Sequence, residues 1–266
     1  MKSILRLAFA ASLLLPLACN QTPGKIISID PDEYSTADQI KIGAAFKAEI
    51  EQNPAFEILS REDYAQAYSY LEILFNTMLQ TAQIDHRLEY DWSVSIVRND
   101  DLSTAFFLPG GHFYINTGLL KYLDSESQLL GVIGHELYYS DTDLLVKRMA
   151  EEFGGTNLGD ILLDNPVENL SEMAAGMPAL TFDETAVLNA DEFAIETICP
   201  FLYDPMGIKT ILEKDLGDSL SLVWVENRQS DVEDRMQKVE NQALNCGLPG
   251  VTNEVDYQKF KVSYLP

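Results

Sequence analysis

The protein has 266 residues, of which 46% are hydrophobic and 10% are aromatic, enough apolar side chain for one sizeable packed domain. Its 42 acidic and 18 basic residues give a formal net charge of -24. A surface this acidic repels phosphate backbones and anionic lipid headgroups, so we expect no nucleic-acid partner. Because no acidic run exceeds a few residues, the charge predicts a well-solvated surface rather than an acidic binding site.

Residues 1–18 have the features of an export signal. A basic start is followed by an apolar run that ends at Ala18 and is shorter than the roughly 20 residues a spanning helix needs. Cys19 follows in a Leu-Ala-Cys sequence that resembles a bacterial lipobox, in which the cysteine is acylated. We therefore predict a signal peptide over 1–18 and a lipid on Cys19, with a plain secretion signal as the alternative. The predicted location is the cell envelope, in the periplasm or at the outer membrane, with the lipid as the membrane anchor.

Three cysteines are present, and lipidation of Cys19 leaves Cys199 and Cys246 as an even pair. An exported chain lies in an oxidising compartment, where such pairs form disulfides. We predict a disulfide between these two residues, with two buried free thiols as the alternative.

Residues 19–35 are polar and contain proline and glycine, which predicts a tether to a single domain over residues 36–266. Apolar residues at helical spacing predict helices near 36–50, 65–79, 125–138, 141–181, 184–198 and 232–244. Strand patterns occupy 90–97, 105–108 and 112–116. Helices, a small sheet and then more helices predict an α+β fold that is mostly helical.

The strongest helix prediction follows Asp124, where Ser125 and Gln128 have the spacing of a capping box. This helix carries His135 and Glu136. In the metal-binding pattern H-E-x-x-H, two histidines on one helix face bind Zn²⁺, and the glutamate polarises the metal-bound water. Here Tyr139 stands where the second histidine would be. Taken alone, the His-Glu pair is that of an ordinary amphipathic helix.

The flanking sequence changes that interpretation. Residues 104–120, TAFFLPGGHFYINTGLL, closely resemble the N-A-F-A-x-P-G-G-x-x-Y-V-x-x-G-L-L stretch of the M48 zinc metallopeptidases. Residues 125–136, SESQLLGVIGHE, resemble the S-E-x-Q-L-x-x-V-x-x-H-E that follows it in that family. Farther on, residues 189–191 match the end of the family's E-x-E-A-D helix. The resemblance covers most of the chain between about residues 32 and 244.

This resemblance implies a zincin-like metallopeptidase fold, with a small sheet whose edge strand borders the active-site helix. By the match, that substrate-binding edge strand contains Gly111, His112, Phe113 and Tyr114. It also implies peptide or protein substrates and a zinc cofactor.

When the family's site residues are matched one by one to positions in this sequence, only some of them are present. The resemblance makes His135 a zinc ligand, Glu136 the residue that activates water, and Asp191 the residue that orients a ligand histidine. Tyr139 and Val187 stand at the other two ligand positions.

A further histidine of the family, near its site, corresponds to Gln229. A structural zinc site contributes roughly 10–16 kcal/mol in all, so losing two ligands should reduce the affinity to about millimolar. We therefore expect zinc to be absent or weakly bound. In the alternative, Asp183, Glu184 or His112 would replace the lost ligands.

Two functions follow from these observations. The first is a non-catalytic M48-like envelope lipoprotein, with Glu136 a vestigial general base. It would bind peptide or protein clients by strand addition along Gly111–Asn116, or would regulate an active peptidase paralogue. The alternative is an active zinc metalloendopeptidase with an atypical ligand set that degrades envelope proteins. A structural lipoprotein without a binding face is a third, weaker interpretation.

Overall fold

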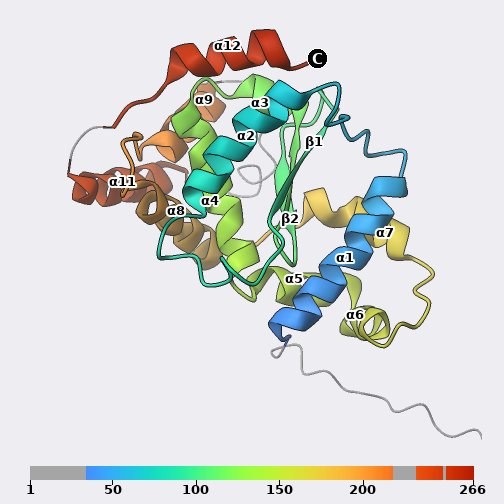
Figure 1. The fold of residues 1–266 in the computed structure, drawn as a ribbon. Coiled ribbons are helices and arrows are strands. Elements are labelled where there is room, and N and C mark those ends of the chain that lie inside the picture. Colours follow the sequence, from blue (N-terminus) through green and yellow to red (C-terminus); the bar gives the residue numbers. More distant parts are fainter. Residues whose placement is uncertain (1–33, 218–231, 248–249) are drawn as a thin grey trace, which may run out of the picture.

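The computed structural model describes residues 34–217, 232–247 and 250–266. The predicted signal peptide, Cys19, nearly all of the tether and the segment around Gln229 lie outside these residues. Within them, many helices surround one small sheet, which agrees with the predicted α+β class (Figure 1). No helix in the described ranges is both long and apolar enough to cross a membrane.

In chain order the elements are α1 (Thr36–Gln52), α2 (Ala65–Met78), β1 (Ser93–Val97), β2 (Ala105–Leu108), β3 (His112–Asn116), α3 (Thr117–Tyr122), α4 (Glu126–Asp141), α5 (Leu144–Phe153), α6 (Gly155–Leu162), α7 (Leu170–Gly176), η1 (Met177–Ala179), α8 (Glu184–Ile198), α9 (Gly207–Gly217), α11 (Val232–Ala243), η2 (Leu244–Cys246) and α12 (Glu254–Tyr264). The predicted strands at 105–108 and 112–116 are confirmed at those bounds. Three helices were not predicted: α3, α9 and α12.

The sheet has the strand order β1-β3-β2. β3 pairs in parallel with β1 and antiparallel with β2, and all five of its residues are buried. The prediction of an edge strand over Gly111 to Tyr114 is therefore wrong. Gly110 and Gly111, with φ of 81° and 92°, turn the chain sharply, and β1 then takes the free side of β3. The edge strand beside α4 is β2.

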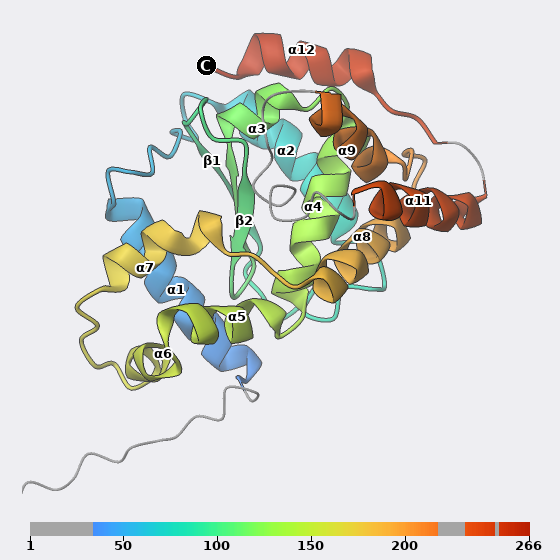
Figure 2. The same ribbon diagram turned by 180° about the vertical axis from the view of Figure 1, so that it is seen from behind.

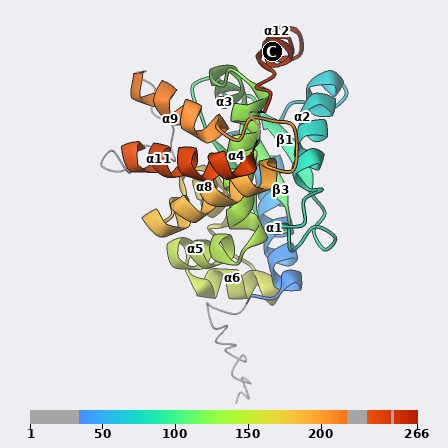
Figure 3. The ribbon, with the colours of Figure 1, turned by 90° about the vertical axis from the view of Figure 1, so that its left-hand side faces the viewer.

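α4 is the central helix of the molecule, and each of its residues except Tyr138 is buried. Ser125 caps its first turn by accepting a hydrogen bond from the Gln128 N–H at 3.2 Å, as the sequence pattern predicts. β2 lies on one side of α4, and α8, α9 and α11 lie on the other (Figures 2 and 3). α4 and α8 cross closely at Gly134, where an added Cβ would lie 2.8 Å from Ala194.

The predicted disulfide is present between Cys199, at the end of α8, and Cys246, in η2. It links two residues that are 47 positions apart, and so fixes the end of α11 to the end of α8.

Closing a loop of this length should stabilise the folded state by about 4 kcal/mol, through the lower entropy of the unfolded chain. We expect the double variant Cys199→Ser, Cys246→Ser to lose about that much unfolding free energy in a urea titration. Dithiothreitol should destabilise the wild-type protein by a similar amount and should leave the double variant unchanged. Equal stability of oxidised and reduced wild-type protein would contradict the expectation.

Candidate functional site

His135 and Asp191 meet in the interior, as the sequence analysis expects. His135 Nδ1 lies 2.8 Å from Asp191 Oδ1, with the histidine on α4 and the aspartate on α8. Arg235, on α11, donates from Nε to Asp191 Oδ2 at 2.8 Å and from Nη2 to Oδ1 at 2.9 Å. The three side chains are only 1%, 4% and 1% exposed. Burial alone would raise the pKa of Asp191, but the hydrogen bonds and charges of His135 and Arg235 lower it, so this residue is a carboxylate.

Tyr139 contacts the side of the His135 imidazole that faces away from Asp191. The Nδ1–H of His135 donates to Asp191, and on the other side of the ring the Tyr139 hydroxyl lies 3.2 Å from Nε2. The phenol ring stacks on Phe182 with 3.6 Å between ring centroids and an angle of 2°. The nitrogen that faces away from Asp191, the one a metal would need, is therefore covered by a tyrosine hydroxyl.

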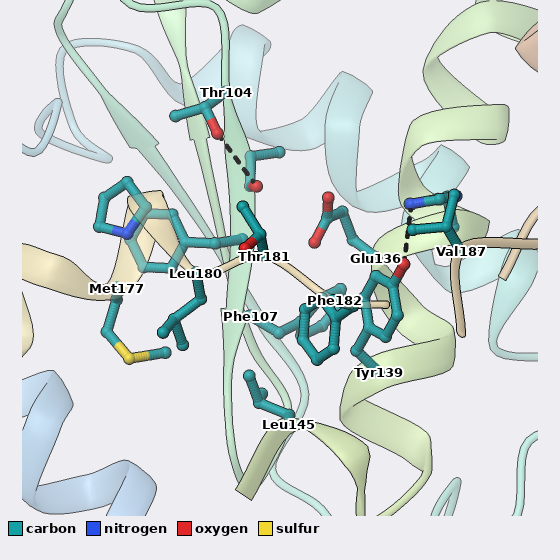
Figure 4. A pocket seen from close by; sticks show the side chains of 14 residues that line it. Thr104, Phe107, Glu136, Tyr139, Leu145, Met177, Leu180, Thr181, Phe182 and Val187 are labelled. Atoms are coloured by element: carbon teal, nitrogen blue, oxygen red, sulfur yellow. Dashed lines mark hydrogen bonds between the residues drawn. The ribbon is translucent and has the colours of Figure 1, made fainter. Parts of the chain in front are cut away.

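Glu136 points into an adjacent cavity (Figure 4). Its side chain is buried, and among the described residues its carboxyl group has no hydrogen-bond or ion-pair partner. Burial without a compensating charge raises its pKa to about 8, so the group is mostly protonated at neutral pH.

The residues present do not fit the three-ligand zinc site of the family. Val187, on α8, is buried and offers no donor atom. Asp183 caps α8 by accepting a hydrogen bond from Ala186 N at 2.9 Å, so its carboxylate serves the helix terminus. Glu184 is exposed in the first turn of the same helix.

The remaining substitute, His112, lies on β3 with Nδ1 2.9 Å from the Ser93 hydroxyl, and burial lowers its pKa to about 4. Within the described part of the chain, no three histidine, cysteine or acidic residues are grouped as a metal site. Weak or absent zinc binding stays a prediction.

The cavity lies between β2, α4 and the segment that joins η1 to α8. Its volume is about 40 Å³. The polar groups at its wall come from α4 and from Thr104 and Thr181. Its apolar lining consists of Ala105, Phe106, Phe107, Leu145, Met177, Pro178, Leu180, Phe182 and Val187.

The outer edge of β2 is buried, and the Ala105 carbonyl there accepts a hydrogen bond from Thr104 Oγ1 at 3.4 Å. Asn116 N donates to the Thr104 carbonyl at 3.1 Å, which places Thr104 in a hydrogen-bonded pair of the antiparallel ladder. Because such pairs alternate, Ala105 and Phe107 direct their N–H and C=O groups away from β3. Within the described residues, neither of these two N–H groups has a hydrogen-bond partner.

The family model of peptidase family M48 matches residues 65–150, from α2 to α5. This segment contains the whole sheet and the helix that carries His135 and Glu136. Residues 65–150 are therefore similar to peptidase family M48.

Two curated relatives support this M48 assignment. A mitochondrial metalloendopeptidase, OMA1 of Arabidopsis thaliana, is 28% identical over 148 residues, which are 53% of this chain and 30% of the relative. The beta-barrel assembly-enhancing protease of Escherichia coli is 28% identical over 142 residues, which are 47% of this chain and 28% of the relative. The chain thus spans less than a third of the length of either relative.

Arg235 was not among the site residues predicted from the sequence. A signal was present, because Arg235 shares a helix face with Val232, Val239 and Ala243, which are all buried. A charged residue in an apolar stripe indicates a buried partner of opposite charge. The sequence did not show that the partner would be Asp191.

The buried Glu136 predicts a dependence of stability on pH. The carboxyl is protonated up to about pH 8 in the folded state and ionises at its ordinary, lower pKa when unfolded. The stability that the protonated carboxyl contributes is therefore present in acid and is lost as the pH rises between these values, by about 1.4 kcal/mol per pH unit at most.

We expect Glu136→Gln to flatten this decline in urea titrations of metal-free protein at pH 5, 6.5 and 8. Glu184→Gln, at an exposed position, is the matched control and should retain the wild-type slope. An unchanged slope in Glu136→Gln would contradict the assignment.

Proposed function

We propose that this chain is a non-catalytic member of family M48 that holds an extended segment of a client or partner protein against β2, on a zincin-like frame. The observation that carries the proposal is the Tyr139 hydroxyl on His135 Nε2. Tyr139 stands at the position of the family's second zinc histidine. Its hydroxyl also lies against the nitrogen of His135 that would bind the metal.

Energetics favour this proposal over catalysis. Each zinc ligand contributes on the order of 3–4 kcal/mol. A phenol binds a metal well only after losing its proton, which an unperturbed tyrosine does near pH 10. Val187 contributes no donor. A metal would also have to displace the hydrogen bond between Tyr139 and His135.

Peptide binding needs none of the lost ligands. A strand added to β2 bonds to the outward backbone groups of Ala105 and Phe107, as in other cases of strand addition. We propose that the clients are envelope proteins and that Cys19 carries the lipid that holds the chain there. The bacterial relative is named for a role in β-barrel assembly, which is consistent with an envelope client. An active peptidase paralogue is a further candidate partner.

A second candidate function is an active zinc metalloendopeptidase with an atypical ligand set. The observation that favours it is the pair of His135 and Asp191, whose hydrogen bond of 2.8 Å orients the imidazole as a zinc ligand would need. Glu136 lies beside this pair.

Zinc analysis separates the two functions. After equilibration with micromolar zinc and dialysis, we expect the wild-type protein to retain less than about 0.1 zinc ion per chain. The double variant Tyr139→His, Val187→Glu restores the family's ligand types and should retain about one. Stoichiometric zinc in the wild-type protein, with casein cleavage that is lost in Glu136→Gln, would establish the second function instead.

Strand addition predicts that an outward N–H of β2 is essential. Ala105→Pro removes that donor at the first residue of the edge strand, where proline is tolerated. We expect this variant to lose about 5-fold in affinity for an extended peptide, measured by fluorescence polarisation, because one backbone hydrogen bond contributes about 1 kcal/mol. Ala105→Ser keeps the N–H and is the matched control. Equal binding by both variants would contradict addition to β2.

A further inference from the structure

We propose that residues 177–182 form a cover over the outer edge of β2, and that the stacked rings of Phe182 and Tyr139 are the latch that keeps this cover closed. The inference rests on the proposed function, because a partner strand can pair with β2 only when the cover has moved aside.

The cover is the chain between the end of α7 and the start of α8. It consists of η1 and the residues from Leu180 to Phe182, and it crosses beside β2 before α8 begins (Figure 2). η1 packs against β2. Ala105 and Phe107 of β2 are only 4% and 1% exposed, so a strand arriving from solvent does not reach them in this conformation.

The cover does not itself pair with the strand that it hides. Within the described residues, no backbone hydrogen bond joins residues 177–182 to β2. Pro178 accounts for part of this, because it has no N–H to donate and lies in a 3₁₀ turn rather than in an extended segment. The outward N–H groups of Ala105 and Phe107 are thus hidden from water without a partner in this part of the chain, which is unfavourable. A strand that takes the place of the cover supplies the missing acceptors.

Two contacts hold the cover closed, and both lie near its end at α8. The Phe182 ring lies flat on the Tyr139 ring of α4, with 3.6 Å between centroids and an angle of 2° (Figure 4). One residue earlier, the Thr181 carbonyl accepts a hydrogen bond of 2.7 Å from Arg148 Nε of α5. Apart from Met177, which is buried, the residues of the cover are partly or fully exposed. Loss of either contact should therefore allow the cover to open more often.

The latch connects the cover to the altered site. Tyr139 stands at the position of the family's second zinc histidine, and its hydroxyl lies 3.2 Å from His135 Nε2 while its ring supports Phe182. The residue that departs from the family's ligand pattern is therefore also the residue that holds the cover.

Hydrogen exchange of the Ala105 and Phe107 N–H groups, followed by NMR, tests the latch without any ligand. Neither group is hydrogen-bonded among the described residues, so the cover is what slows their exchange with water. In the oxidised, metal-free protein we expect Phe182→Ala to speed this exchange about 10-fold, because a stacked pair of rings is lost. Phe193→Ala is the matched control and should keep the wild-type rate, since this half-buried ring packs on Tyr138, outside the cover.

A second variant protects the test against misfolding of the first. Arg148→Ala removes the hydrogen bond to Thr181 and should also speed the exchange about 10-fold. Its matched control is the double variant Glu151→Gln, Glu152→Gln, which removes the ion pairs of Arg148 but keeps that hydrogen bond. Wild-type exchange rates in both Phe182→Ala and Arg148→Ala would overturn the inference.

The extended peptide of the strand-addition test then separates the cover from the proposed function. We expect Phe182→Ala and Arg148→Ala to bind this peptide up to about 10-fold more tightly than the wild-type protein, because the open form is more populated before binding. Unchanged affinity in variants with faster exchange would overturn the cover as the barrier to β2. If the peptide binds none of these proteins, the proposed function fails, and the exchange rates alone decide whether residues 177–182 are a latched cover.

Discussion

The buried carboxylate of Asp191 is the constraint on which the interior depends. Taking a carboxylate and a guanidinium out of water costs several kcal/mol for each ion, so Asp191 and Arg235 require each other. The same carboxylate accepts the His135 Nδ1–H, so one ion holds side chains from α4, α8 and α11 together. This role needs no metal. It gives a structural reason for His135 and Asp191 to be present beside Tyr139 and Val187.

Beside this ion group, aromatic rings pack next to the imidazole of His135. The Tyr139 ring lies between His135 and Phe182, where it contributes apolar contact as well as a hydroxyl. Glu136 is affected differently. It is buried near the imidazole, and this burial raises the pKa of its carboxyl group.

Local signals predicted much of the fold, and long-range pairing accounts for what was missed. The strand pieces at 105–108 and 112–116 followed from a turn with two glycines between apolar runs, and α4 followed from its cap and apolar stripe. Strand order did not follow, because the pairing of β1 with β3 joins segments that no local pattern connects. The contact of Arg235 with Asp191 spans 44 residues. The disulfide was predicted because Cys199 and Cys246 were the two cysteines left once Cys19 was assigned to the predicted lipid.

That disulfide makes the chain between Cys199 and Cys246 a covalently closed ring, with α9 and α11 inside it. A protease that cuts the ring once leaves both pieces attached to the molecule. Arg235 thus stays close to Asp191 after such a cut, and the fragments separate only when the disulfide is reduced as well. A single backbone break inside the ring therefore does not release the part of the chain that carries Arg235.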